Sequence, residues 1–308
     1  MRILVTGGAG FIASHVTDAY VAAGHDVAVL DDLSGGKRQN LNPRAAFHEC
    51  DVQSAEVEKL FADFKPEVLN HHAAQMDVRK SVADPRFDAR VNLVGLLNLL
   101  EAGRQHGLEK VIFASSGGTV YGEQETFPAP EDHPKRPVSP YGISKLSSEH
   151  YLYFYQVQYG LRWVAFRYGN VYGPRQNPHG EAGVLAIFAE KFLSGDQPVV
   201  TGDGKQSRDY VFIDDVVRAN VSALTTEYNG PLNIGTGIET DVNTLFRLVG
   251  SECGSKAPEK HVAARPGEQR RSVVDPSLAG RILGWRPEVG LEDGVARTLA
   301  FFRARREA

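Results

Sequence analysis

Short apolar runs alternate with longer amphipathic stretches through the first half of the 308-residue chain, and this alternation restricts the fold more than any other feature. Apolar strands separated by helices are typical of βαβ units, whose parallel sheet is covered on both faces. The sequence therefore predicts an α/β fold with a doubly wound parallel sheet. The predicted strands are Ile3–Val5, Val27–Leu30, Val68–Asn70, Val111–Ala114 and Trp163–Phe166. The predicted helices are Ser14–Ala23, Ser54–Phe64, Arg86–His106 and Ser144–Gln158.

The pattern loosens after about Gly173, where prolines and glycines gather and the predicted elements become shorter. We therefore predict that residues 1–173 form the sheet domain. Residues 174–308 are predicted to form a smaller C-terminal α/β part that returns some segments to the first domain. Its predicted elements are the helix Val184–Ser194, the strand Asp209–Ile213, the helix Asp214–Thr225, the strand Leu232–Ile234 and helices near Val242–Cys253 and Leu291–Arg305.

Charge balance and cysteine content exclude several classes of protein. Lys and Arg number 34 and Asp and Glu 38, which gives a net charge of −4. Nucleic acids and anionic membranes are bound through basic surfaces, so neither is an expected partner. No apolar run approaches the ~18 residues of a membrane span, and His15, His71 and His72 lack the spacing of a metal site. The only cysteines, Cys50 and Cys253, suit the reducing cytoplasm, where we expect the protein.

A glycine-rich turn joins the first predicted strand to the first predicted helix, over Val5–Ala13. Gly7 allows a tight turn, and Gly10 removes a side chain where a pyrophosphate must approach the backbone. The helix that begins near Phe11 then offers its free N–H groups and its positive dipole end to the anion. A plain glycine-rich turn is the alternative, but the strand–turn–helix context favours a Rossmann-type dinucleotide site.

Asp31 ends the second predicted strand, 21 residues beyond Gly10. A carboxylate there accepts hydrogen bonds from an adenosine ribose and repels a 2′-phosphate, so NAD is favoured over NADP. Lys37 and Arg38 follow closely and leave NADP open as the alternative.

Tyr141 and Lys145 lie four residues apart, at the start of a predicted helix. Ser139 is a typical N-cap and Pro140 suits the first helical position, so the pair shares one helix face. A free phenol with a pKa of ~10 is a poor base at neutral pH. A neighbouring ammonium group and a helix N-terminus both stabilise the phenolate, which lets the pair act as a general base.

These motifs together resemble the extended short-chain dehydrogenase/reductase family, in particular its nucleotide-sugar 4-epimerases of the UDP-glucose 4-epimerase type. The resemblance covers nearly the whole chain. It rests on Thr6–Ile12, Asp31–Gly35, His72–Gln75, Ser115–Gly122, Tyr141–Lys145, Arg167–Pro174 and Arg208–Val211.

The resemblance implies an isomerase of galactose metabolism that uses bound NAD and consumes none. Tyr141 would take the proton from the sugar 4-hydroxyl while hydride leaves C4, and return of hydride to the other face of the 4-keto sugar inverts C4. The implied substrates are UDP-glucose and UDP-galactose, with N-acetylated forms as further candidates, bound by the C-terminal part. Two chains would form a homodimer by pairing Arg86–His106 and Ser144–Gln158 in a four-helix bundle.

The resemblance also implies a residue set for each ligand. Lys145 would hold the nicotinamide ribose, and Asp51 the adenine. Arg208 and Arg265 would grip the diphosphate, and Ser272 would face the sugar 2-position. The implied cofactor residues are Gly7, Gly10, Phe11, Ile12, Asp31, Asp32, Ser34, Gly35, Asp51, Val52, His72, Ala73, Ala74, Gln75, Asn92, Tyr141, Lys145 and Tyr168. The implied substrate residues are Ser116, Asn170, Val184, Leu185, Arg208, Arg265, Glu268 and Ser272.

The segment after Ser115 departs from the family pattern. Gly117 stands where relatives carry a Ser or Thr that bridges the catalytic tyrosine and the sugar oxygen. Ser116 is the favoured replacement, with Thr119 or a water molecule as alternatives. Related 4,6-dehydratases carry an Asp-Glu pair at the positions of Gly118 and Thr119, so dehydration is disfavoured. Another family dehydratase or reductase, or a catalytically idle NAD(H)-binding regulatory module, remains the alternative function.

Overall fold

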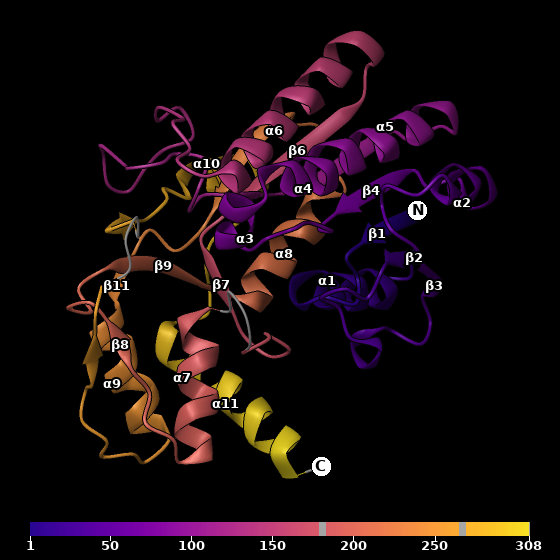
Figure 1. Ribbon diagram of the computed structural model, residues 1–308. Coiled ribbons are helices and arrows are strands. Elements are labelled where there is room, and N and C mark those ends of the chain that lie inside the picture. The colour runs from indigo at the N-terminus through magenta and orange to yellow at the C-terminus, as the bar shows by residue number, and fades with distance from the viewer. Residues whose placement is uncertain (179–182, 265–268, 308) are drawn as a thin grey trace.

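The structure is a computed structural model that describes residues 1–178, 183–264 and 269–307. Its centre is a seven-stranded sheet of order β10-β6-β5-β4-β1-β2-β3, in which every neighbouring pair is parallel (Figure 1). The strands are β1 (Arg2–Thr6), β2 (Asp26–Asp31), β3 (Ala46–Glu49), β4 (Val68–His71), β5 (Lys110–Ser116), β6 (Arg162–Tyr168) and β10 (Gly230–Ile234). The predicted doubly wound parallel sheet is confirmed.

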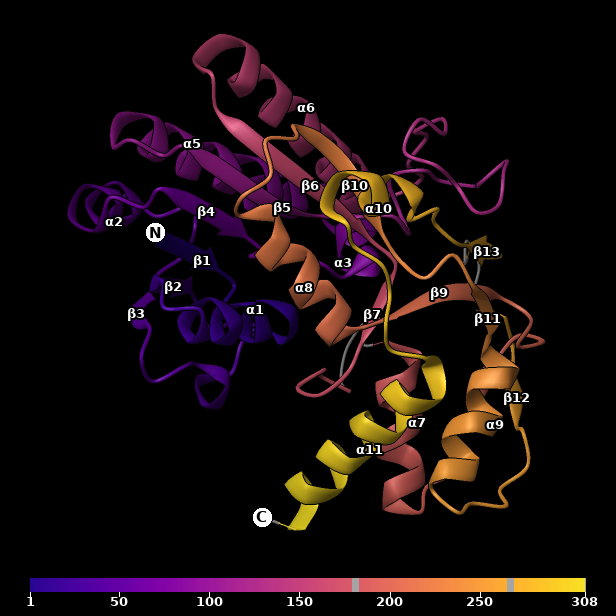
Figure 2. The ribbon, with the colours of Figure 1, turned by 180° about the vertical axis from the view of Figure 1, so that it is seen from behind.

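Helices cover both faces of this sheet because successive strand residues point to opposite sides. In β1, Ile3 and Val5 pack into one hydrophobic cluster and Leu4 packs into another. The first cluster lies under α1 (Phe11–Ala22) and α8 (Ile213–Ala223). The second lies under α2 (Glu56–Phe64), α5 (Gly95–Gln105) and α6 (Pro140–Tyr159), and Figures 1 and 2 show α5 and α6 on the same side of the sheet.

The helix predicted over Arg86–His106 is present, but its middle turn is π-helical. The chain forms α3 (Val78–Ala83), α4 (Pro85–Ala89), a π-helical turn over Arg90–Val94 and then α5. Asp84 starts α4 as its N-cap by accepting a hydrogen bond from the Phe87 amide at 3.0 Å. A π-turn inside a helix often marks a functional site, and this one turns the Asn92 side chain toward α6, where its Nδ2 lies 3.1 Å from the Ser144 Oγ.

The C-terminal part is a smaller α/β unit built around β9 (Ser207–Phe212), as Figure 2 shows. Its remaining elements are β7 (Asn170–Tyr172), β8 (Val200–Thr201), β11 (Glu239–Asp241), β12 (His261–Val262), β13 (Arg271–Ser272), α7 (Val184–Ser194), α9 (Val242–Glu252), α10 (Ser277–Leu283) and α11 (Leu291–Glu307). The strand β10 follows residue 173 in the sequence but pairs with β6, so it forms one edge of the large sheet. The division at residue 173 stays a prediction.

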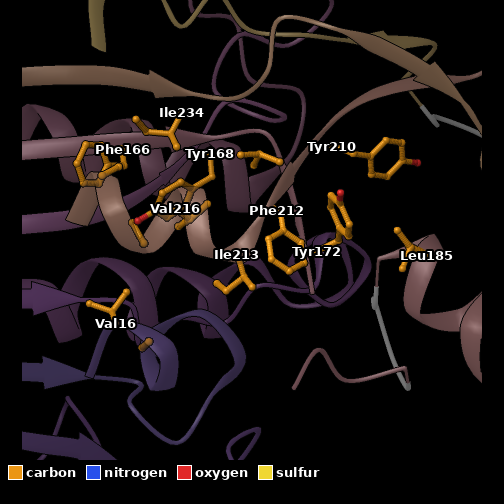
Figure 3. Packing of buried hydrophobic residues seen from close by; sticks show 14 of the residues in the cluster. Val16, Phe166, Tyr168, Tyr172, Leu185, Tyr210, Phe212, Ile213, Val216 and Ile234 are labelled. Atoms are coloured by element: carbon orange, nitrogen blue, oxygen red, sulfur yellow. The ribbon is translucent and has the colours of Figure 1, made fainter. Parts of the chain in front are cut away.

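One hydrophobic cluster joins the two parts. It runs from Val16 on α1 through Tyr168 to Tyr172, Tyr210 and Leu185 (Figure 3). Because packed cores resist shear, this cluster fixes the C-terminal part against the end of the large sheet. None of the helices among the described residues combines the length and the apolar character needed to span a bilayer.

Candidate active site

The glycine-rich turn between β1 and α1 has the form of a phosphate cradle. Gly7 has a φ of +72°, and a Cβ there would lie 2.8 Å from the Ala73 amide nitrogen, so only glycine fits. The N-cap of α1 is Gly10, and no side chain caps the helix. The amide groups near Phe11 and Ile12 are therefore available to an anion.

Asp31 lies at the end of β2, beside this turn, as predicted. Its Oδ2 accepts a hydrogen bond from the Ala9 amide at 3.0 Å, and its Oδ1 accepts one from the Leu33 amide at 2.8 Å. Burial raises its pKa, and these two hydrogen bonds oppose that change. The uncapped helix end and the adjoining carboxylate fit the pyrophosphate and ribose of a dinucleotide.

The residues predicted to follow Asp31 lie at the rim of this site. Asp32 accepts hydrogen bonds from the amide and the hydroxyl of Ser34, at 2.9 and 2.6 Å. A Cβ on Gly35 would meet nothing within 4 Å. The Asp51 side chain is exposed, so its carboxylate is open to solvent, whereas the Val52 side chain is buried.

Tyr141 and Lys145 lie in the first turns of α6, as predicted. Ser139 is the N-cap, since its Oγ accepts from the Gly142 amide at 3.1 Å, and Pro140 is the first helical residue. Lys145 is 3% exposed, and its Nζ lies 5.7 Å from the centre of the Tyr141 ring. Burial lowers the pKa of Lys145 to about 8, and the Asp88 carboxylate opposes that decrease.

The imidazoles of His71 and His72 adjoin this ammonium group. Burial and the charge of Lys145 lower the pKa of His72 to about 3 and hold the pKa of His71 well below its usual value. Both rings are therefore neutral at neutral pH. His72 stacks on Tyr168, and its Nε2 lies 3.2 Å from the Tyr168 hydroxyl.

Val274 occupies the space that a side chain at residue 117 would need. A Cβ on Gly117 would lie 2.7 Å from the Val274 Cγ1 and 3.1 Å from the carbonyl oxygens of Arg167 and Tyr168. The hydroxyl that the family resemblance implies at this position is therefore excluded by packing. The sequence does not predict that Val274 contacts position 117, because the two residues are 157 positions apart along the chain.

Three other hydroxyls surround the glycine pair. A Cβ on Gly118 would lie 3.9 Å from the Oγ of Ser116 and 3.9 Å from the Oγ of Ser272, so these two hydroxyls face the same point. The Oγ1 of Thr119 is buried and has no hydrogen-bond partner among the described residues. A sugar oxygen in this space could meet the Ser116 and Ser272 hydroxyls.

The backbone after β4 closes the other side of the site. The Ala73 amide donates to the Thr6 Oγ1 at 3.2 Å, and Ala74 follows, half-buried. The Gln75 amide donates to the Asn92 Oδ1 at 2.9 Å. The π-turn and the loop after β4 therefore hold each other in place.

Of the predicted substrate residues, Ser116 ends β5, and Asn170, Arg208, Ser272, Val184 and Leu185 lie on β7, β9, β13 and α7. Ser272 is the register partner of Arg208, and Asn170 that of Tyr210. Val184 begins α7, followed by the buried Leu185. Arg265 and Glu268 lie outside the described residues.

Asp88 is a residue near the catalytic pair that the sequence reasoning missed. It is 1% exposed, although charged residues are rarely so deeply buried without a partner. Asp88 precedes Asn92 by four residues, so the two side chains share one face of the predicted helix. This spacing beside a predicted cofactor residue could have pointed to Asp88. No group of three or more His, Cys, Asp or Glu side chains in the described part of the chain is arranged to hold a metal ion.

Comparison with known proteins identifies the family. The model of the NAD dependent epimerase/dehydratase family matches residues 3–235. The chain belongs to this family. The UDP-glucose 4-epimerase of Mycolicibacterium smegmatis is 46% identical over 309 residues, which cover 98% of this chain and 99% of that protein.

Two solved structures are similar over almost their full length. A UDP-glucose 4-epimerase of Thermotoga maritima with UDP-glucose has a TM-score of 0.98 at 47% identity, and the match covers 99% of each chain. The UDP-glucose 4-epimerase of Thermus thermophilus in complex with NAD has a TM-score of 0.93 at 47% identity, with 98% of this chain and 99% of that chain covered. The match to the family model confirms the predicted family. It also confirms NAD as the cofactor, because the family is NAD-dependent.

Proposed function

We propose that the protein catalyses the NAD-dependent interconversion of UDP-glucose and UDP-galactose by epimerisation at C4 of the sugar. The observation that carries the proposal is the buried Lys145 ammonium beside Tyr141, in a chain that shares 47% identity with two UDP-glucose 4-epimerases of the same fold. UDP-glucose in one of those structures and NAD in the other support this pair of ligands.

Each residue of the site has a separate role in the transfer of the proton from the sugar 4-hydroxyl. NAD, when bound, supplies the acceptor and later the donor of the hydride. Lys145 favours the phenolate of Tyr141 electrostatically, and the phenolate accepts the proton of the sugar 4-hydroxyl. Ser116 and Thr119 supply hydroxyl donors to the sugar oxygen, because Val274 closes position 117.

We further propose that Arg208, Arg265, Asn170 and Glu268 bind the nucleotide diphosphate and its ribose, with the α7 start over the base. Guanidinium groups suit phosphate oxygens because their N–H groups form a planar fork. The 3.9 Å between the Ser272 Oγ and a Cβ built on Gly118 supports a place for Ser272 beside the sugar. A small side chain there leaves space for an N-acetyl group at the sugar 2-position.

The alternative functions lack support at particular residues. A 4,6-dehydratase needs an acid and a base where this chain has Gly118 and Thr119. A catalytically idle NAD(H)-binding module would not need both Tyr141 and Lys145. This chain has both residues, and the Lys145 ammonium group is buried beside the Tyr141 ring.

We also propose that two copies pair through α5 and α6. The exposed apolar side chains here include Val94 on the π-turn and Ile143, Tyr151, Tyr153, Phe154, Val157 and Tyr159 on α6. Of the residues expected to pair, Leu96, Leu99, Leu100, Leu152 and Tyr155 are instead buried in the protein's own core. A cytoplasmic location is proposed because Cys50 and Cys253 are both free thiols.

The direct test is turnover of UDP-galactose by the purified protein without added NAD. UDP-glucose should form and approach an equilibrium mixture, because the cofactor is regenerated in each cycle. Tyr141→Phe is the control for contaminating activity. Absence of UDP-glucose with NAD-loaded protein would refute the proposed function.

A further inference from the structure

Asp88 is a buried carboxylate close to the catalytic pair. It lies on α4 and is 1% exposed. Its Oδ2 accepts hydrogen bonds from the Gln75 Nε2 at 3.0 Å and from the Asn92 Nδ2 at 3.1 Å. Its Oδ1 is buried and has no hydrogen-bond partner among the described residues. Burying a carboxylate costs free energy unless its oxygens are hydrogen-bonded or an opposite charge lies nearby.

Lys145 provides that opposite charge. Its side chain is buried on α6, and the Asp88 carboxylate raises the Lys145 pKa against the larger lowering effect of burial. The helices that carry the two residues, α4 and α6, are packed together. Each group therefore offsets part of the cost of burying the other.

None of the other groups described around Lys145 supplies a negative charge to its ammonium group. His71 and His72 are neutral, because burial and Lys145 itself lower their pKa values. The Phe113 ring, whose centre lies 4.7 Å from the Lys145 Nζ, carries no charge. Glu149, one turn along α6, is bound in a buried ion pair with Arg167 at 2.6 Å.

The π-turn fixes Asp88 with respect to the catalytic helix. The Asn92 Nδ2 contacts the Asp88 Oδ2, the Gln75 carbonyl oxygen at 3.0 Å and the Ser144 Oγ at 3.1 Å. Ser144 directly precedes Lys145, and its Oγ donates to the Tyr141 carbonyl oxygen at 2.9 Å. One hydrogen-bonded chain thus connects the carboxylate to the backbone of the catalytic pair.

We propose that Asp88 is a positioning residue that keeps Lys145 protonated, and thereby keeps Tyr141 able to accept the substrate proton, up to mildly alkaline pH. The inference rests on the proposed function, since it assigns Asp88 a part in that reaction. Asp88 acts through Lys145 and needs no contact with the sugar or the cofactor.

Asp88→Asn tests this with little change of shape. The amide oxygen can still accept from Gln75 and Asn92, but the charge is gone. Without that charge, the alkaline limb of the pH profile of kcat/KM should move to lower pH by about one unit. That shift corresponds to about a tenfold loss of kcat/KM above the limb, with a much smaller change at pH 6.5. Asp84→Asn is the matched control, because it removes a charge from the exposed N-cap of the same helix.

A second readout needs no activity. In protein labelled with 13C at lysine Cε, NMR follows the titration of Lys145, whose signal is identified by its loss in Lys145→Met. The titration midpoint should lie near the expected value of about 8 in the unmodified protein and lower in Asp88→Asn. This readout separates a failure of the Asp88 proposal from a failure of the epimerase proposal.

An unchanged alkaline limb and an unchanged Lys145 titration in Asp88→Asn would overturn the proposal, even if stability fell. Asp88→Ser, which also removes the charge, replaces Asp88→Asn if that variant does not fold. Titration of Lys145 below about pH 7 in the unmodified protein would overturn the proposal without any variant at Asp88.

Discussion

Gly117→Ser should destabilise the protein, although it supplies the hydroxyl that the family resemblance implies at this position. The new Cβ would lie 2.7 Å from the Val274 Cγ1, a separation that real Cβ atoms do not show, so a neighbour must move. Val274 is 1% exposed and packs in a cluster with Val120, Tyr121 and Ala129. The carbonyl oxygens of Arg167 and Tyr168, each 3.1 Å from the Cβ, belong to backbone that cannot readily shift.

Overpacking a fitted core of this kind costs about 1–3 kcal/mol, and we expect a value near 2 kcal/mol. For a chain of this size, that loss lowers the Tm by roughly 3 °C. The assay is thermal unfolding of the NAD-loaded protein, followed by circular dichroism. Gly118→Ser is the matched control, because its Cβ would meet its nearest neighbours, the Oγ atoms of Ser116 and Ser272, only at 3.9 Å.

The cause of the effect is tested by adding Val274→Ala. This substitution leaves its own cavity, but it also removes the methyl group that blocks position 117. The double variant Gly117→Ser/Val274→Ala should therefore be more stable than the sum of the two single changes, by about 1 kcal/mol or more. A Tm of Gly117→Ser equal to that of Gly118→Ser, or strict additivity with Val274→Ala, would refute the steric argument.

Four further outcomes follow from the site and the surface. Tyr141→Phe should keep its NAD but lose at least ~100-fold in kcat, the scale of general acid–base catalysis, and near-normal turnover would contradict its role. Activity should fall above about pH 8, because Lys145 loses its proton there, and a pH profile that stays flat to pH 10 would contradict this. Ser272→Tyr should lower kcat/KM for UDP-N-acetylgalactosamine more than for UDP-galactose, and an equal loss on both would show that another residue limits the substrate. Light scattering at micromolar concentration should give a dimer mass that Phe154→Asp reduces, and a monomer before substitution would contradict the proposed pairing.

Local signals in the sequence predict much of the large sheet and the position of the catalytic pair. The apolar runs correspond to β1, β2, β4, β5 and β6, because fully buried parallel strands need continuous apolar residues. The start of α6 follows from Ser139 and Pro140, whose capping preferences act over a single turn.

Contacts between distant segments are what the sequence does not reveal. The π-helical turn between α4 and α5 contains Asn92, which bonds to Gln75 and Ser144, and no helical period encodes these contacts. The exclusion of a side chain at Gly117 depends on Val274, which reaches it only after the C-terminal part has folded back. Both features lie at the active site, where tertiary contacts override local preference.

The most direct test of the central claim follows the hydrogen at C4 of the sugar. UDP-galactose carrying deuterium at C4 is converted by the purified protein in ordinary water, and the UDP-glucose formed is analysed by mass spectrometry and NMR. Hydride transfer within one site, with Tyr141 handling only the hydroxyl proton, predicts that the deuterium is retained at C4. Replacement of the deuterium by solvent hydrogen would contradict the account, since C4 would then have exchanged a proton with water.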